Sequence, residues 1–247
     1  MKGKKRMMKM MNQQRKYCNA LAIETGSSSG SVAVMKNGKL SALTFLDINV
    51  THSERLMPAI DFALKNCRLS IKDMEAVYFA NGPGSFTGIR IGLATAKGIC
   101  NALNIPLIPI NTLILSAMNC LASQNNVAVV HDAKMGELYA AVYDKNLNEI
   151  IAPHNCLPRD FAELLKFEKL TFCGSGFSLY KDELTENVKE WNVLPEFLNI
   201  PLASGAFYVK SEFAIEHTGE ELENLEPYYL RKSQAELVKE EKEKNKQ

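Results

Sequence analysis

The stretch from Gly82 to Gly92 has the residue types of an anion-binding turn. It reads Gly-Pro-Gly-Ser-Phe-Thr-Gly-Ile-Arg-Ile-Gly and lies between a short apolar segment, 76–80, and a segment with room for a helix. A strand, a glycine-rich turn and a helix in this order free backbone N–H groups to face a phosphate. The glycine spacing, however, misses the dinucleotide-binding fingerprint by one residue, and no Gly-Lys-Ser/Thr occurs. Because Pro83 also removes an N–H donor, a conventional nucleotide loop is disfavoured.

Nucleophiles and metal ligands are the next candidates for chemistry. Ser85, Thr87 and Thr25 carry hydroxyls, but no histidine lies near them in the sequence, and such residues more often cap helices and turns. The four histidines form no His-x-x-x-His pair, and the six cysteines form no Cys-x-x-Cys. We therefore expect no catalytic residue and no metal site. Scattered cysteines in a chain of this size indicate reduced thiols and a cytoplasmic protein.

Small residues recur at every fourth position in the helix expected at 88–103. Gly88, Gly92 and Ala96 therefore share one helical face. Each glycine inside a helix lowers its stability by about 1 kcal/mol relative to alanine. The missing side chains are therefore expected to make room for a closely packed neighbour. Two alternatives stay open, a neighbouring element of the same chain and a second polypeptide. Burial of all three residues under the chain's own core would exclude the second alternative.

Composition limits the class of protein. The chain has 247 residues, of which 46% are hydrophobic and 23% charged, as in a globular protein with one large or two ordinary domains. No run of 18 apolar residues occurs, so no membrane-spanning segment is expected. The net charge of +1 includes seven basic residues and no acid within residues 1–16. Removing these seven charges leaves −6, which disfavours nucleic-acid binding by the folded body alone.

The two ends of the chain are expected to lie outside the fold. Residues 1–16 are interpreted as a basic disordered leader, because they lack the apolar stretch of a signal peptide. Two alternatives are considered for this segment. Either the given start lies upstream of a folded protein that begins near Tyr17, or residues 1–16 form a basic arm that touches RNA. Residues 232–247 are rich in Lys and Glu and are interpreted as a charged tail.

The first half of the chain predicts three strands, a helix, a strand and a second helix. Asn37-Gly38 is the residue pair of a type I′ hairpin turn between the second and third strands. Ser53 is expected to cap the first helix, whose apolar residues form one stripe. The expected strands are 21–23, 31–35, 39–45, 76–80 and 105–110, and the expected helices are 53–67, 88–103 and 111–123.

At Val127 the opening order begins again. A strand, a polar turn and a second strand are followed by a hairpin loop and a third strand, and then by a helix and a further strand. The expected strands are 127–130, 137–143, 147–151 and 170–173, and the expected helices are 160–167, 178–186 and 204–216.

This duplication predicts an α/β fold of the actin, hexokinase and Hsp70 class (ASKHA), with two βββαβα-type subdomains. The N-terminal subdomain is expected at residues 17–123 and the C-terminal one at 124–231. Proteins of this class bind nucleotide in the cleft between the halves, with an acid from each half near the metal and phosphates. Glu24 and Asp132 follow the first strand of each copy, so a vestigial nucleotide site is predicted at Glu24, Thr25, Ser27 and Asp132.

Four segments give the chain a more specific resemblance, to the bacterial TsaB family, also called YeaZ. They are spread over residues 20 to 231, and the glycine-rich turn is the most specific of them. The segments are Gly82–Gly92, Asp132-Ala-Lys-Met-Gly-Glu-Leu-Tyr139, His52-Ser-Glu-Arg-Leu56 and Glu226-Pro-Tyr-Tyr-Leu-Arg231.

The resemblance implies a non-catalytic scaffold subunit that forms a heterodimer with a TsaD-type catalytic subunit. A TsaE-type ATPase would join the assembly, which makes the N6-threonylcarbamoyl modification of adenosine 37 in tRNA. The chain would touch tRNA only through the complex. No cofactor is expected to bind the chain itself, and ATP or ADP would lie at the junction of the complex. When its partner is absent, the chain is expected to form a homodimer through the same face.

The resemblance also implies where the partner binds, namely on the helices at 53–67 and 88–103. The predicted interface consists of Leu56, Ile60, Ala63, Leu64, Cys67, Gly88, Ile89, Gly92, Leu93, Ala96 and Ile99. The residues of the family motif that are expected to have a structural role are Gly82, Pro83, Gly84, Ser85, Phe86, Thr87 and Arg90.

The sequence departs from the family pattern at three places. Glu24 stands where relatives usually have Asp, and its longer side chain would reposition a metal-bound phosphate, which disfavours a working ATP site. Lys134 stands where relatives mostly have Arg, and the basic leader has no counterpart. Two other functions compete with the scaffold: an active ATP-dependent kinase or ATPase using Glu24 and Asp132, and a glycoprotease-like metallopeptidase, which would need a paired-histidine site.

Overall fold

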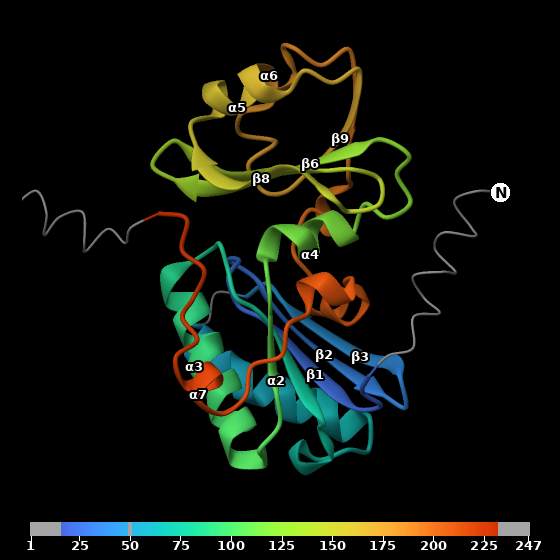
Figure 1. The fold of residues 1–247 in the computed structure, drawn as a ribbon, viewed down its shortest axis with the longest axis vertical. Helices are drawn as coiled ribbons and strands as arrows, with labels where there is room; N and C mark the ends of the chain where they lie inside the picture. Colours follow the sequence, from blue (N-terminus) through green and yellow to red (C-terminus); the bar gives the residue numbers. More distant parts are fainter. Residues whose placement is uncertain (1–15, 49–50, 232–247) are drawn as a thin grey trace, which may run out of the picture.

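The computed structural model describes residues 16–48 and 51–231, which form two five-stranded sheets stacked end to end (Figure 1). The first sheet has the order β3-β2-β1-β4-β5, and the second has the order β10-β9-β6-β7-β8. The strands of the first sheet are β1 (Ala20–Glu24), β2 (Gly30–Lys36), β3 (Lys39–Leu46), β4 (Ala76–Ala80) and β5 (Leu107–Ile110). The strands of the second sheet are β6 (Asn126–Lys134), β7 (Glu137–Tyr143), β8 (Glu149–Cys156), β9 (Lys169–Cys173) and β10 (Glu190–Val193).

The two sheets have the same topology. In each, three antiparallel strands (β1–β3 and β6–β8) come first, and the fourth strand then pairs in parallel with the first. This repetition confirms the duplicated ASKHA class. The Asn37-Gly38 hairpin is also confirmed, because both residues have the positive φ that a type I′ turn requires, 51° and 72°.

Two long helices, α2 (His52–Asn66) and α3 (Phe86–Leu103), cover one face of the first sheet. The prediction that Ser53 caps α2 is wrong: the N-cap is Thr51, which forms a capping box with Glu54. Ser85 caps α3, its Oγ accepting the Gly88 N–H at 3.3 Å. A short 3-10 turn, η1 (Ile71–Asp73), precedes β4.

The small-residue face of α3 packs against its own chain. Gly88, Gly92 and Ala96 are all buried, and a Cβ atom at Gly88 or Gly92 would clash with Thr25, which follows β1. At Gly92 it would also lie 2.6 Å from Cε2 of Phe79 in β4. The missing side chains therefore let the helix approach the sheet and the turn after β1, and this burial excludes a second polypeptide on that face.

The predicted interface is thereby corrected. The apolar stripes of α2 and α3 face the sheet, since burying them there removes their apolar surface from water. Ile99 is half-buried and packs against the same core. The other predicted interface residues, all buried, are Leu56, Ile60, Ala63, Leu64, Cys67, Gly88, Ile89, Gly92, Leu93 and Ala96.

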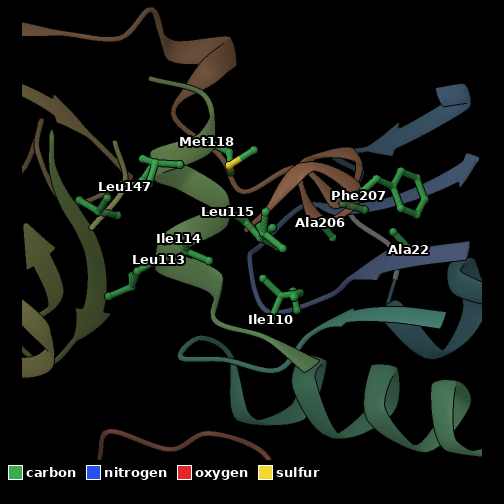
Figure 2. Packing of buried hydrophobic residues seen from close by; sticks show 14 of the residues in the cluster. Ala22, Ile110, Leu113, Ile114, Leu115, Met118, Leu147, Ala206 and Phe207 are labelled. Atoms are coloured by element: carbon green, nitrogen blue, oxygen red, sulfur yellow. The ribbon is translucent and has the colours of Figure 1, made fainter. Parts of the chain in front are cut away.

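A hydrophobic cluster joins the two sheets across the opposite face of the first one (Figure 2). Its centre is α4 (Thr112–Met118), a short helix in which every residue is buried. Leu115 and Met118 of α4 lie with Phe207 of the 3-10 turn η3 (Ala203–Tyr208) in this cluster, which also contains residues of β1 and β6. A mainly apolar helix that is buried all round needs partners on every side, and here the two sheets and η3 supply them.

The C-terminal part of the chain differs most from the sequence prediction. The helix expected at 204–216 is wrong, because this segment forms η3 and η4 (Ser211–Phe213), both 3-10 turns. The strand β10 was not anticipated. The remaining elements are α5 (Pro158–Leu164), α6 (Lys181–Thr185), η2 (Glu196–Leu198) and α7 (Gly219–Glu223).

The predicted C-terminal subdomain, 124–231, does not pack as one unit. Residues of η3 contact β1, β2 and β4, and α7 contacts α3, so the end of the chain returns to the first sheet. No helix in the part of the chain that the structure describes is long and apolar enough to cross a membrane. The predicted tail and all but one residue of the predicted leader lie outside the described residues.

Two glycines of α3 provide a matched test of the close approach of this helix to the first sheet. We expect Gly92→Ala to lower the free energy of unfolding by about 1–3 kcal/mol, because its Cβ clashes with Thr25 and Phe79. Gly98 faces open space, so Gly98→Ala should instead raise it by up to about 1 kcal/mol through helix propensity. Urea unfolding of the two variants measures both effects, and equal effects of the same sign would contradict the packing described here.

Candidate functional site in the cleft between the sheets

A cavity of about 630 Å³ lies between the two sheets, where the turns after β1 and β4 face the β6–β7 hairpin. The first half contributes the turn at 26–28, His52 and residues 83–86. The second half contributes residues 131–134, 175 and 178–179, while residues 199–201 and Arg231 close the sides. The cavity therefore occupies the place where this fold class binds its ligands, at the C-terminal ends of the central strands.

Glu24, the acid at the end of β1, points into its own turn and away from this cavity. Its two carboxylate oxygens accept hydrogen bonds from the backbone N–H and the Oγ of Ser27, both at 2.9 Å, and the residue is 1% exposed. Burial raises the pKa of this carboxyl to about 7, against the opposing effect of the Ser27 hydrogen bonds and the nearby Arg55 charge. Glu24 thus stabilises the turn and does not line the cavity.

Arg55 and His52 of α2 hold the same turn from the other side. The guanidinium donates to the Ser28 carbonyl at 3.0 Å and to two carbonyls at the end of β3 and just beyond it. A ring nitrogen of His52 lies 3.1 Å from the Ser27 carbonyl. Burial and the Arg55 charge lower the pKa of His52, so its ring is neutral at pH 7. The His-Ser-Glu-Arg-Leu segment therefore has a structural role in fixing the β1–β2 turn.

The glycine-rich turn uses its backbone groups within the chain. The Ser85 N–H donates to the Gly26 carbonyl at 2.7 Å, and Gly84 lies so close to Gly26 that a Cβ atom would be 2.5 Å from that carbonyl oxygen. The turn therefore contacts the β1–β2 turn and begins α3. Pro83, Gly84, Ser85 and Phe86 line the cavity.

The C-terminal segment 226–231 crosses the glycine-rich turn. The Tyr228 N–H donates to the Asn81 carbonyl at 2.8 Å, and the Tyr229 ring stacks on Phe86 with centroids 4.4 Å apart. Arg90 donates to the Tyr229 hydroxyl at 2.8 Å. Two of the motifs identified in the sequence, around Phe86 and around Tyr229, therefore belong to one aromatic cluster. Thr87 is exposed at the start of α3.

The second half presents His131 and Asp132 to the cavity. His131 Nε2 lies 2.7 Å from the Ser116 hydroxyl, and burial lowers its pKa to about 4, so this imidazole is neutral at pH 7. Asp132 forms an ion pair with Lys134 at 2.7 Å and also accepts the Lys134 N–H. Arg231 forms a second ion pair, with Glu137 at 2.9 Å, at the side of the cavity.

Of the four residues predicted as a vestigial nucleotide site, Ser27 and Asp132 line the cavity, whereas Glu24 and Thr25 are buried behind it. His131, Ser175 and Arg231 also line it and were not predicted. The sequence contained a signal for each of them. These signals are the neighbouring Asp132 for His131, the Gly174-Ser175-Gly176 turn for Ser175 and the C-terminal motif for Arg231. The residues do not fit a Mg²⁺–nucleotide site, because the Glu24 oxygens are bonded to Ser27 and the Asp132 carboxylate to Lys134. The described residues contain no cluster of three or more metal-binding side chains.

Comparison with known proteins connects this fold with a family. Residues 48–237 match the family model described as TsaD, tRNA N6-adenosine threonylcarbamoyltransferase. The tRNA threonylcarbamoyladenosine biosynthesis protein TsaB of Haemophilus influenzae is 31% identical over 225 residues, which span 85% of this chain and 92% of that protein. The chain belongs to the TsaB family.

Further relatives agree with this assignment. TsaB of Escherichia coli is 28% identical over 229 residues, covering 87% of this chain and 95% of that protein. The structure of YeaZ from Pseudomonas aeruginosa shares the fold, with a TM-score of 0.71, 22% identity and coverage of 87% of this chain and 100% of that chain. The TsaB family assignment thus rests on nearly the whole length of its relatives, and the resemblance seen in the sequence is confirmed.

The buried carboxyl of Glu24 predicts a pH dependence of stability. Its pKa is 4.5 in an ordinary environment and about 7 in the fold, so folding disfavours the charged form. The cost is absent below pH 4.5, grows as the pH rises and is complete above pH 7. Between pH 5 and pH 8 the protein should therefore lose about 2.5 kcal/mol relative to Glu24→Gln.

Urea unfolding of both proteins at several pH values measures this difference. Glu163→Gln, at an exposed position of α5, is the control and should show no pH-dependent difference from the unchanged protein. A constant difference between the unchanged protein and Glu24→Gln across this range would show that the Glu24 carboxyl is not desolvated.

Proposed function

We propose that this chain is a non-catalytic scaffold subunit in the N6-threonylcarbamoylation of adenosine 37 of tRNA. In this proposal it binds a TsaD-type catalytic subunit, and a TsaE-type ATPase joins the assembly. The chain contacts tRNA only through the complex, in the cytoplasm. Family membership supports the pathway, since the relatives that match along most of the chain are named for threonylcarbamoyladenosine biosynthesis.

The position of Glu24 is the observation that carries the non-catalytic role. An enzyme of this fold class needs acidic groups free to face a metal and phosphates, whereas here one acid is bonded inside its own turn and the other is paired with Lys134. The glycine-rich turn likewise uses its Ser85 N–H on Gly26. We therefore assign adenine-nucleotide binding to the junction of the complex and not to this chain alone.

The docking face for the catalytic subunit is proposed on the outward side of α2 and α3. This keeps the two helices expected from the sequence and replaces the buried residues with exposed ones. Met57 and Phe62 of α2 are 51% and 61% exposed. Ala94 and Gly98 of α3 are exposed, are one turn apart and leave room for another helix. Exposed large apolar side chains and exposed small residues on neighbouring helices are features suited to helix–helix docking.

The double variant Met57→Lys/Phe62→Lys tests this face. We expect the dissociation constant for the purified catalytic subunit to rise at least about tenfold, because two buried apolar contacts would be replaced by charges. Phe197→Lys, at a 73% exposed position of η2, is the control and should bind normally. Calorimetry and the yield of modified tRNA in the reconstituted reaction are the measurements. Normal binding by the double variant would place the docking face elsewhere.

An active ATP-dependent enzyme is the second candidate, and the 630 Å³ cavity is the observation that favours it. The scaffold proposal expects no Mg²⁺-dependent ATP binding by the isolated chain, because neither acid is free to hold the metal. Calorimetry with ATP, with and without Mg²⁺, distinguishes the two. Micromolar Mg²⁺-dependent affinity that is lost in Asp132→Asn would support the enzyme and contradict the scaffold.

A further inference from the structure

The cavity between the sheets is lined by two hydrogen-bond donors that the fold itself does not use. Tyr139 of β7 lines the cavity and is 6% exposed, and its hydroxyl has no hydrogen-bond partner among the described residues. Arg231 also lines the cavity, and its hydrogen bonds to Glu137 and to the Lys134 carbonyl both use Nη1. Its Nη2 is left without a partner in the part of the chain that the structure describes. Since polar groups of buried side chains are ordinarily hydrogen-bonded, these two donors are suited to a ligand.

The two donors lie near one another and are both able to donate at neutral pH. Burial raises the pKa of Tyr139, and the nearby Arg231 charge opposes this rise. The phenol is therefore protonated at pH 7. His131, which pairs with Tyr139 across β6 and β7, has a neutral imidazole and adds no charge. A phenol O–H near a guanidinium N–H is a donor set for a negatively charged oxygen.

The charges around these donors limit which anion fits. Lys134 is paired with Asp132 and Arg231 with Glu137, so the four charges sum to zero. The wall therefore supplies directed donors without an excess of positive charge. A carboxylate brings one negative charge on two oxygens, a geometry that matches a guanidinium. A phosphate monoester brings nearly two charges at pH 7 and would need further cations.

The other polar groups that line the cavity are mainly hydroxyls. Ser28 and Ser85 line it on the first half, and Ser175 and Ser178 on the second. Because a hydroxyl both donates and accepts, these serines are suited to hydroxyl groups of a ligand. Phe86 adds an aromatic surface to the same cavity. A volume of about 630 Å³ lies in the range of small-molecule sites.

We propose that this cavity binds a hydroxylated organic carboxylate, of the sugar-acid class, without a metal ion. The ligand's carboxylate accepts hydrogen bonds from Arg231 Nη2 and the Tyr139 hydroxyl, and its own hydroxyls bond to the serines. This site differs from the nucleotide site predicted from the sequence, because it needs neither Mg²⁺ nor an acidic residue free to hold one. Met57 and Phe62 do not line the cavity, so ligand binding and catalytic-subunit docking are tested by different variants.

Titration calorimetry with gluconate, in buffer that contains EDTA, tests the proposal. Gluconate should bind with one molecule per chain and with the same affinity when Mg²⁺ replaces EDTA. Glucose lacks the carboxylate and acetate lacks the hydroxyls, so each should bind at least about tenfold more weakly. Glucose 6-phosphate keeps the hydroxyls but carries the larger charge, and it should also bind more weakly than gluconate.

Two variants and two matched controls locate the site. Tyr139→Phe removes only the hydroxyl and should raise the dissociation constant for gluconate about tenfold. Arg231→Gln should raise it by at least as much, because it removes the guanidinium. Tyr180→Phe and Arg159→Gln change a half-buried tyrosine and an exposed arginine that do not line the cavity, and both should bind normally. Circular dichroism checks that each variant folds.

Three results would overturn the proposal. The first is the absence of gluconate binding up to about 10 mM. The second is an affinity for glucose 6-phosphate that equals or exceeds the affinity for gluconate, which would exclude a carboxylate site. The third is unchanged binding of gluconate by both Tyr139→Phe and Arg231→Gln, which would place the ligand outside this wall of the cavity.

Discussion

Burial of α4 between the two sheets is the contact on which the rest of the structure depends. Leu113, Ile114, Leu115 and Met118 bring apolar surface to both sheets at once, and each such side chain is worth about 1.5–3 kcal/mol when fully buried. Because this cluster contains residues of β1 and β6 together, it joins the two copies, each of which also has a hydrophobic cluster of its own on the other face of its sheet. The cavity beside α4 exists because the turns of the two sheets meet there without filling the space.

The second constraint is the close approach of α3 to the turn after β1. Gly88 and Gly92 let the helix contact Thr25, and Ser85 then bonds to Gly26. The Ser85 N–H is engaged by the Gly26 carbonyl, and the Glu24 carboxyl is likewise turned inward. A segment with the order of a phosphate site has thus become part of the framework.

The outer surfaces follow from the same packing. Since α2 and α3 turn their apolar stripes toward the sheet, the residues left for partners are those on the opposite side, Met57 and Phe62 among them. The C-terminal segment, by returning to Asn81 and Phe86, ties the second half to the first and completes the wall of the cavity. The outward sides of α2 and α3 are therefore candidate functional surfaces in addition to the cleft.

The sequence by itself determined the repeated strand order, the Asn37-Gly38 hairpin and the TsaB family, because local turn chemistry, strand periodicity and specific motifs do not depend on distant contacts. It also showed that Gly88, Gly92 and Ala96 share a face. Only the tertiary structure decided what that face contacts, because the pattern of small residues on a helix is the same whether the helix packs against its own chain or against another. The direction of the Glu24 carboxylate and the return of residues 203–231 to the first sheet were likewise decided by long-range packing, which short-range patterns do not specify.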